Sequence, residues 1–383
     1  MLRVLIVSQA TPQWLVDQIC MALPKNTEVD CITGSKVSNV NIIQAPCYNN
    51  KSYFTKLISW FQFTFFLFSW NKNDTQPYDL LIATSNPPFN SFSLIKVKEK
   101  RKCPFVFINW DIYPQGVISA NSPFPLNIVF KVWSKINNKY YPKIDQIITI
   151  GESMKQLIND YLSKPLNIKV IPISVDTNKI QPVLKKCNVF LQQNNINSRW
   201  IVLYSGAMGY SKNIELILET AKILEEDTEI TFVLIGSGPK YHIAKDYIKK
   251  QRLKNVCLFP LQSEDIYPHS ISCGDIAILP EQIKKVNTSI PSKCYSMMAS
   301  GEAIIAVSHR ENDLARLIIE NEIGEVVDVE DAQVLAKTIV KLLYDEDRLR
   351  TYKENARSIA KQKFSLEEVN RKYKSVFDSL IGS

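Results

Sequence analysis

The chain has 383 residues, more than a single hydrophobic core usually carries, so two domains of ordinary size are expected. Hydrophobic residues make up 45% of the chain and charged residues 22%, which excludes a disordered or fibrous protein. No uninterrupted apolar stretch reaches about 18 residues, so no membrane-spanning helix is expected, and the short apolar N-terminal run is interpreted as a buried strand. The eight cysteines form no Cys-x-x-Cys pair, which argues against a zinc ribbon or a disulfide scaffold.

The positive charge is concentrated in the first half. The net charge is +8, and residues 1–165 contain 17 Lys and Arg against 10 Asp and Glu. Part of this charge is the basic run 96–102, which is either a solvated face or, together with the aromatic segment Leu57–Trp70, a surface for acidic lipid. The aromatic segment itself is either an interfacial helix or an ordinary buried helix with its connecting loop.

Short β-branched runs alternate with helical periodicity along the first half. The predicted strands are Arg3–Ser8, Glu28–Thr33, Asn41–Ala45, Tyr78–Thr84, Pro104–Asn109, Gln146–Ile150 and Ile168–Ile173. Leu15, Ile19 and Leu23 recur at helical spacing, which predicts a helix after the first strand. Runs that are apolar on both faces are typical of a parallel sheet covered by helices.

The second half repeats this pattern after a proline-containing linker at residues 171–186. The predicted strands are Trp200–Ser205, Glu229–Ile235, Asn255–Phe259, Asp275–Leu279 and Ala303–Val307, and the predicted helices are Ile214–Glu226, Tyr241–Arg252 and Ser292–Ser300. From Asp331 onward the chain is predicted to be helical throughout. Two doubly wound domains facing each other would form a cleft at the carboxyl ends of their strands, where such sheets bind ligands.

Two segments of the second half carry features of a phosphate site. Gly206 and Gly209 let the backbone turn closely around a ligand, and Lys212 stands just before a predicted helix. In the second segment, a helix that begins near Pro291 or Ser292 would present free amides beside Lys293. Each segment alone is also compatible with a plain turn and a solvated lysine, but two helix N-termini with two lysines can neutralise a diphosphate.

Several stretches in both halves of the sequence resemble a known family. The stretches YSGAMGYSKNIELILETAKIL, FVLIGSGP, NVCLFPLQSEDIYPHSISCGDIAILP and PSKCYSMMASGEAIIA are similar to the donor half of family-4 glycosyltransferases of the GT-B fold. In the first half, DLLIATSNPPF, FINWDIYP, QIITIGESM and KVIPISVD occur in the order that this family has. The nearest resemblance is to the bacterial branch that builds capsule, colanic-acid-like and O-antigen polysaccharides.

The resemblance implies an α/β protein of the GT-B class, with two Rossmann-like doubly wound domains facing a central cleft. Residues 1–174 would form the acceptor-binding domain and residues 175–360 the nucleotide-sugar-binding domain. Residues 361–383 would be a helical tail that packs back toward the N-terminal domain.

The implied activity is a metal-independent, anomer-retaining transfer of a sugar from a nucleotide-diphosphate sugar to a saccharide or lipid-linked acceptor. No cofactor besides this donor substrate is implied, and the expected catalytic residues are Asp111, Lys212 and Lys293. The donor would be held by Ser205, Gly206, Lys212, Asn213, Leu261, Gln262, Thr288, Ser289, Ile290, Ser292 and Lys293. The acceptor would contact Gln9, Thr11, Trp110 and Tyr113.

The sequence departs from the family's pattern in three places. The family commonly has two Glu residues seven positions apart around the donor, where this chain has Thr288 and Ser296. Glu281 lies upstream and replaces neither of them. The first loop, residues 8–12, lacks the Gly-Gly of many relatives, and Asp111 stands in the region where the family often has a His.

The expected partners are a nucleotide sugar, a saccharide or lipid-linked oligosaccharide and an anionic membrane surface, with no nucleic acid. The expected location is the cytoplasm, either away from the membrane or at the inner face of the cytoplasmic membrane. Because both Glu positions are lost, a second interpretation remains open: a non-catalytic glycosyltransferase-like subunit of a polysaccharide synthase complex. A GT-B nucleotide-sugar epimerase fits poorly, because the first half has no His.

Overall fold

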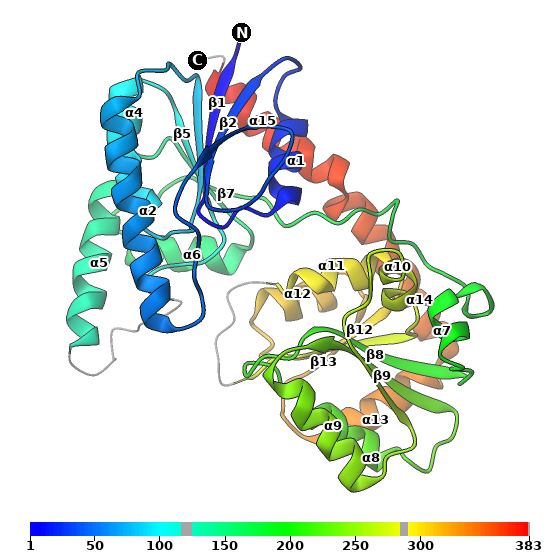
Figure 1. The fold of residues 1–383 in the computed structure, drawn as a ribbon. Coiled ribbons are helices and arrows are strands. Elements are labelled where there is room, and N and C mark those ends of the chain that lie inside the picture. The colour runs from blue at the N-terminus through cyan, green and yellow to red at the C-terminus, as the bar shows by residue number, and fades with distance from the viewer. Residues whose placement is uncertain (116–124, 284–289, 382–383) are drawn as a thin grey trace. The chain divides into compact units, whose positions relative to one another are not determined.

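The computed structural model describes residues 1–115, 125–283 and 290–381 (Figure 1). The chain forms two compact units. Unit 1 consists of Met1–Pro172 together with Val369–Ser383, and unit 2 consists of Ile173–Glu368. The chain therefore passes between the units twice, once in the predicted linker and once within its last helix.

Unit 1 is built on a seven-stranded parallel sheet with the strand order β3-β2-β1-β4-β5-β6-β7. Its strands are β1 Arg3–Val7, β2 Glu28–Thr33, β3 Asn41–Gln44, β4 Leu80–Thr84, β5 Phe105–Asn109, β6 Gln146–Thr149 and β7 Ile168–Val170. All seven strands predicted for the first half are confirmed. The strand order reverses between β1 and β4, which makes a topological switch point at their carboxyl ends.

Helices cover the sheet of unit 1, because its strands are apolar on both faces. The helical elements are α1 Gln13–Ala22, α2 Tyr53–Asn73, α3 Asn90–Ser93, α4 Ile95–Arg101, α5 Leu126–Tyr140, η1 Tyr141–Lys143, α6 Glu152–Tyr161 and α15 Leu366–Ile381. Leu15 and Ile19 of α1 form one core with Tyr373 and Phe377 of α15 and with alternate residues of β1, β4 and β5. The last helix thus belongs to the core of the first domain.

Helix α2 is longer than the predicted aromatic segment at both ends. Ser52 caps its N-terminus by accepting a hydrogen bond from the Thr55 amide at 3.1 Å. At the other end, Lys100 and Arg101 of α4 donate to the Asp74 carbonyl at 3.0 and 2.9 Å. These cations satisfy carbonyls at the end of α2, where the helix dipole favours positive charge.

Unit 2 contains a six-stranded parallel sheet with the order β10-β9-β8-β11-β12-β13. Its strands are β8 Trp200–Ala207, β9 Ile230–Ser237, β10 Val256–Phe259, β11 Ile276–Pro280, β12 Ala303–Val307 and β13 Gly324–Val327. The five predicted strands are confirmed, and β13 was missed because Glu325 interrupts its short apolar run. The strand order reverses between β8 and β11, so the switch point of unit 2 lies between these two strands.

The helices of unit 2 bury two apolar clusters, one on each face of this sheet. The helical elements are η2 Lys185–Cys187, α7 Val189–Gln193, α8 Ile214–Ile223, α9 Pro239–Gln251, α10 Tyr267–Ile271, α11 Ser292–Ala299, α12 Asp313–Glu320, α13 Ala332–Leu343, α14 Glu346–Ile359 and η3 Ala360–Phe364. The prediction that the chain is helical throughout from Asp331 was wrong. Asp345 caps α14 with its side chain, and Ser365 has extended backbone, so the tail is divided into separate helices.

Candidate functional site

The two segments predicted to bind phosphate meet at the switch point of unit 2. The first follows β8 and ends at Asn213, whose side chain caps α8 by accepting from the Leu216 amide at 3.2 Å. The second leads into α11, which begins at Ser292 as predicted. Because β8 and β11 are neighbours in the sheet, their following segments lie at one edge, and Lys212 forms an isolated antiparallel bridge with Glu281.

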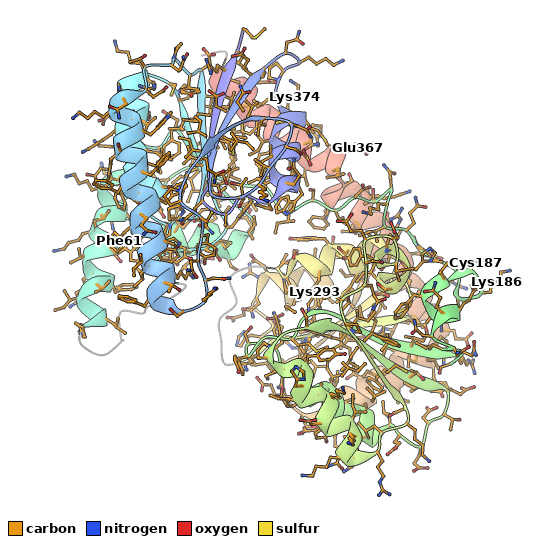
Figure 2. All side chains as sticks on the ribbon, in the orientation of Figure 1. Phe61, Lys186, Cys187, Lys293, Glu367 and Lys374 are labelled. Carbon is orange, nitrogen blue, oxygen red and sulfur yellow. The ribbon has the colours of Figure 1, made fainter. Side chains whose placement is uncertain are left out.

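Lys293 is the central side chain of this site (Figure 2). Its Nζ is buried and has no hydrogen-bond partner among the residues that the structure describes. The ammonium lies 4.0 Å from the centroid of the Tyr204 ring. The pKa of Lys293 is lowered to about 7, mainly by burial and also by the charge of Lys212, while the carboxylate of Glu281 partly opposes both effects. A buried amine without a partner is suited to an anionic ligand.

Gly206 lets Lys293 reach this position. Its φ of +140° is rarely adopted by residues with a side chain, and a Cβ added here would lie 3.0 Å from Lys293 Cδ and 3.4 Å from Nζ. The segment Gly236–Gly238 packs directly against the end of β8. A Cβ on Gly236 would lie 2.1 Å from the Gly206 carbonyl oxygen. Close backbone approach therefore requires Gly236, and the positive φ favours glycine at position 206. A Cβ at Gly209, the other glycine predicted to turn around a ligand, would meet no atom within 4 Å.

Lys212 is not a free cation in the structure. Its Nζ forms an ion pair and hydrogen bond with Oε1 of Glu281, and the Glu281 side chain is only 4% exposed. Lys240 donates from its Nζ to the Lys212 carbonyl at 2.7 Å and so fixes the loop that precedes α8. Sequence reasoning missed Glu281 and Lys240 as members of the site, because both lie outside the expected motifs. An anion on Lys212 would have to compete with the Glu281 carboxylate.

The remaining predicted donor residues lie at the same edge of the sheet, in different surroundings. Ser205 is buried in β8, Ile290 is half-buried against the core, and Ser292 is exposed at the start of α11. Leu261 and Gln262 follow the edge strand β10, and Leu261 is largely exposed. Thr288 and Ser289 lie outside the described residues.

The predicted acceptor residues Gln9 and Thr11 follow β1 at the switch point of unit 1, and both are buried. Gln9 donates from Nε2 to the Ser59 carbonyl at 2.8 Å, which ties the loop to α2. Thr11 donates to the Ser8 carbonyl at 2.7 Å. These contacts show both side chains holding the loop in place.

Trp110, Asp111 and Tyr113 follow β5 in unit 1. The Ser85 hydroxyl accepts hydrogen bonds from the Trp110 and Asp111 amides, both at 3.1 Å. The Asp111 side chain reaches solvent, yet neighbouring atoms desolvate the carboxyl group and raise its pKa, against the opposite influence of Lys56. The Tyr113 ring stacks on Trp133 with centroids 5.7 Å apart. Asp111 is thus the exposed titratable group of this segment.

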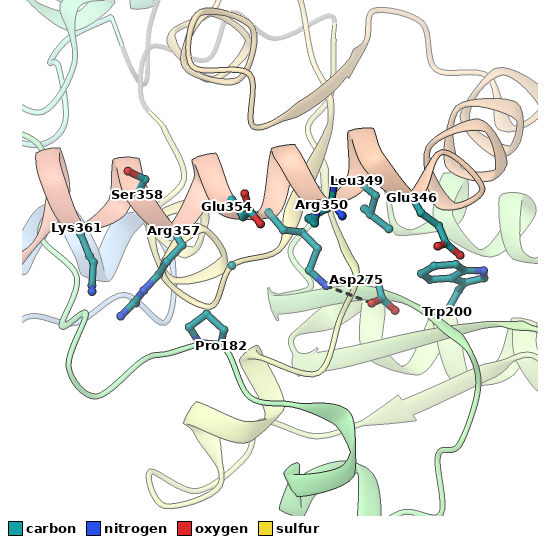
Figure 3. Close-up of a pocket in the computed structure, with 12 residues that line it drawn as sticks. Pro182, Trp200, Asp275, Glu346, Leu349, Arg350, Glu354, Arg357, Ser358 and Lys361 are labelled. Atoms are coloured by element: carbon teal, nitrogen blue, oxygen red, sulfur yellow. Dashed lines mark hydrogen bonds and ion pairs between the residues drawn. The ribbon is translucent and has the colours of Figure 1, made fainter.

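A cavity of about 840 Å³ lies elsewhere in unit 2, along α14 (Figure 3). It is lined by Trp200 and Asp275, which stand at the amino ends of β8 and β11. Lys353 and Lys185 pair with Asp275 at 3.3 and 2.5 Å. Because ligands of parallel sheets bind at the carboxyl ends of the strands, we do not assign the donor to this cavity.

Comparison with known proteins relates parts of the chain to glycosyltransferases. Residues 188–359 match the family model described as Glycosyl transferases group 1. The chain is 22% identical over 268 residues to the probable glycosyltransferase WbjE of Pseudomonas aeruginosa, covering 68% of this chain and 65% of that protein. It is 25% identical over 180 residues to the putative colanic acid biosynthesis glycosyl transferase WcaI of Escherichia coli, covering 45% and 43%. The chain therefore matches less than two thirds of either relative.

Solved structures establish the fold. The sucrose-phosphate synthase of Thermosynechococcus elongatus superimposes with a TM-score of 0.78 at 16% identity, with all of both chains covered. The Anabaena protein HepE, solved in complex with UDP-glucose, gives a TM-score of 0.72 at 15% identity, over 99% of this chain and 100% of that one. The two parallel-sheet units and these superpositions confirm the GT-B fold.

Residues 188–359 are thus similar to the group 1 glycosyltransferase model, and both relatives carry glycosyltransferase names. Within the described part of the chain, no helix is both long and apolar enough to cross a membrane.

Proposed function

We propose that this protein transfers a sugar from a nucleotide-diphosphate sugar to a hydroxyl group of a saccharide or lipid-linked acceptor, with retention at the anomeric carbon. The observation that carries the proposal is the Lys293 ammonium, buried against Gly206 beside the start of α11. Helix N-terminal amides and cations at a switch point are suited to a diphosphate. The UDP-glucose bound in the complex of HepE supports the donor class.

The proposed reaction separates charge, and the cations would stabilise that charge. The bond from the anomeric carbon to the diphosphate oxygen breaks, and its electron pair leaves with the nucleotide diphosphate. The acceptor oxygen bonds to the anomeric carbon from the same face, and its proton passes to the leaving phosphate oxygen. Lys293, Lys212 and the α11 amides would stabilise the negative charge on the leaving group. Asp111 would orient the acceptor or a sugar hydroxyl.

The acceptor is proposed to belong to the synthesis of a bacterial surface polysaccharide. This step rests on the name of WcaI, which assigns that protein to colanic acid biosynthesis, and on the stretches of this sequence that resemble that branch. No metal is required in this scheme, because lysines and helix amides take the role of a cation.

A thermal-shift panel of UDP-, GDP- and CDP-sugars tests donor binding. A bound ligand at about a hundredfold its dissociation constant stabilises a fold by about 2.7 kcal/mol. Lys293→Ala is the clean variant, because it removes a buried amine without breaking an ion pair, and it should abolish the shift. Lys245→Ala, at an exposed position of α9, is the matched control and should keep the shift. A full shift in Lys293→Ala would remove Lys293 from the site and overturn the proposal.

Lys212 requires a paired design, since Lys212→Ala alone would leave the Glu281 carboxylate buried without its partner. The double variant Lys212→Gln with Glu281→Gln removes both charges together and should bind the donor more weakly.

One specific observation favours the non-catalytic alternative: the Glu281 carboxylate forms an ion pair with Lys212, which is then not free to bind a diphosphate. Release of nucleotide diphosphate in the presence of saccharide acceptors decides between the two functions. Donor binding without release would establish the non-catalytic subunit, whereas release that is lost in Asp111→Asn supports the enzyme.

A further inference from the structure

Unit 1 exposes an apolar face on two of its helices. Helix α2 carries large exposed side chains at a spacing of three and four residues, which puts them on one face. They are Phe54, Ile58, Phe61, Phe65 and Phe68. Phe61 is 61% exposed and Phe65 is 76% exposed, although Phe63 and Leu67 of the same helix are buried in the core. Helix α2 is therefore apolar on the side that faces solvent as well as on the side that faces the protein.

Helix α5 continues this face. Its exposed apolar side chains are Leu126, Ile128, Val129 and Val132. The two helices lie side by side in Figure 1, and α3 packs against both of them. Phe89, just before α3, joins them directly, because its ring centroid lies 5.3 Å from that of Phe61 and 5.4 Å from that of Trp133. We call these nine exposed apolar residues, with the lysines described next, the α2–α5 surface.

The charged residues on the two helices of this surface are all positive. Neither helix contains Asp or Glu. Four exposed lysines belong to the helices, namely Lys72, Lys131, Lys135 and Lys139. Lys96 of α4 adds a further cation with its Nζ 5.3 Å from the Phe68 ring centroid. Exposed aromatic residues flanked by lysines, without acidic residues, complement the boundary between anionic headgroups and acyl chains.

The basic run 96–102 contributes less to this surface than its sequence predicted. Lys98 pairs with Asp145 at 2.7 Å, and Arg101 pairs with Asp74 at 2.8 Å while its guanidinium is buried. Lys100 donates to the carbonyls that end α2. These cations hold helices together, so the charge available to a lipid comes mainly from α2 and α5.

We propose that the α2–α5 surface docks the protein on an anionic lipid bilayer, with both helices lying in the interface. A single exposed apolar residue is ordinary, but nine on two helices joined through Phe89 exceed scattered exposure, and large exposed apolar surfaces mark binding sites. A second copy of the chain is a poor occupant, because pairing two identical surfaces would bring their lysines together without any acidic residue. The proposal gives the proposed function a membrane partner, yet docking itself requires no sugar donor.

Co-sedimentation of the full chain with vesicles tests the proposal. The protein should sediment with phosphatidylcholine vesicles that contain phosphatidylglycerol, more weakly with phosphatidylcholine alone, and less as salt is raised. Phe61→Ser with Phe65→Ser should weaken partitioning by roughly tenfold or more. Val129→Ser with Val132→Ser should weaken it as well. Replacing Lys131, Lys135 and Lys139 by Gln should reduce the preference for anionic vesicles by about fivefold per lysine.

The matched control is Ile243→Ser with Val334→Ser, two exposed apolar positions of unit 2 that should leave partitioning unchanged. All substituted positions are exposed, so the melting temperatures should remain close to that of the parent protein. Three outcomes would overturn the proposal: no binding of the parent protein to anionic vesicles, equal binding of the phenylalanine variant, or a dimer that this variant converts to a monomer. The assay contains no nucleotide sugar, and the thermal-shift panel contains no lipid, so either proposal can fail alone.

Discussion

At Lys293, burial favours the neutral amine, whereas the proposed binding of a diphosphate favours the charged ammonium. Burial lowers its pKa to about 7, so at pH 8 the unliganded protein holds it mostly neutral. In the unfolded chain the lysine keeps its ordinary pKa of 10.5 and binds more protons than the folded state does. The contribution of Lys293 to folding stability is therefore least favourable below pH 7 and improves as the pH rises from 7 toward 10.5.

This arrangement predicts that donor binding takes up a proton. A diphosphate beside Lys293 favours the ammonium form, so binding at pH 8 should take up about one proton. Titration calorimetry in two buffers with different ionisation enthalpies measures this number from the difference in apparent binding enthalpy. Lys293→Gln should remove the buffer dependence of whatever binding it retains. Equal enthalpies in both buffers for the parent protein would contradict the prediction.

Glu302 is a second buried ionisable residue, away from the proposed donor site. Its side chain is 1% exposed, Oε1 accepts a hydrogen bond from the Gly274 amide at 2.9 Å, and Oε2 has no partner among the described residues. Burial raises the pKa of Glu302 well above its ordinary value of 4.5. The unfolded chain ionises first as the pH rises, so Glu302 increasingly destabilises the fold above about pH 4.5.

Glu302→Gln keeps the shape and the acceptor oxygen but cannot ionise. We expect its melting temperature, relative to that of the parent protein, to rise steadily between pH 5 and pH 8. Thermal unfolding of both proteins across this pH range measures the difference in melting temperature. A destabilisation by the amide that does not depend on pH shifts this difference equally at every pH and does not affect its trend. A difference that does not change with pH would show that Glu302 is ionised in the folded protein.

At the scale of single elements, the sequence predicted the twelve strands it named, because a buried parallel strand is a short run that is apolar on both faces. It missed β13, where only Gly324 fits, since a Cβ there would lie 1.8 Å from the Ile304 carbonyl oxygen. Helix α5 was also missed, although it supplies half of the α2–α5 surface. Its residues Leu126, Ile128, Val129 and Val132 are apolar yet exposed, so the apolar positions alone do not identify the side that the protein buries.

At the scale of the whole molecule, the chain does not divide at a single point. Helix α15 follows unit 2 in sequence, yet Val369, Tyr373, Val376 and Phe377 are buried in the core of unit 1. The stability of the N-terminal unit therefore depends on the last residues of the chain.

Phe377→Ala tests this dependence. Truncating a fully buried phenylalanine typically costs about 3–5 kcal/mol. Hydrogen exchange should show faster opening of β1 and α1, with unit 2 little changed. Lys374→Ala on the exposed side of the same helix is the control and should have little effect. Loss of protection confined to unit 2 would contradict the assignment of α15 to unit 1.

The sequence by itself determined the alternation of strands and helices and the pair of lysine-bearing segments, because both depend on local periodicity and on glycine and helix-start signals. Only the tertiary structure decided which groups meet. It paired Lys212 with Glu281, which lies 69 positions along the chain, left Lys293 over Tyr204, and turned Gln9 and Thr11 inward. Burial and ion pairing depend on neighbours brought together by strand order, and no single segment of the chain contains that information.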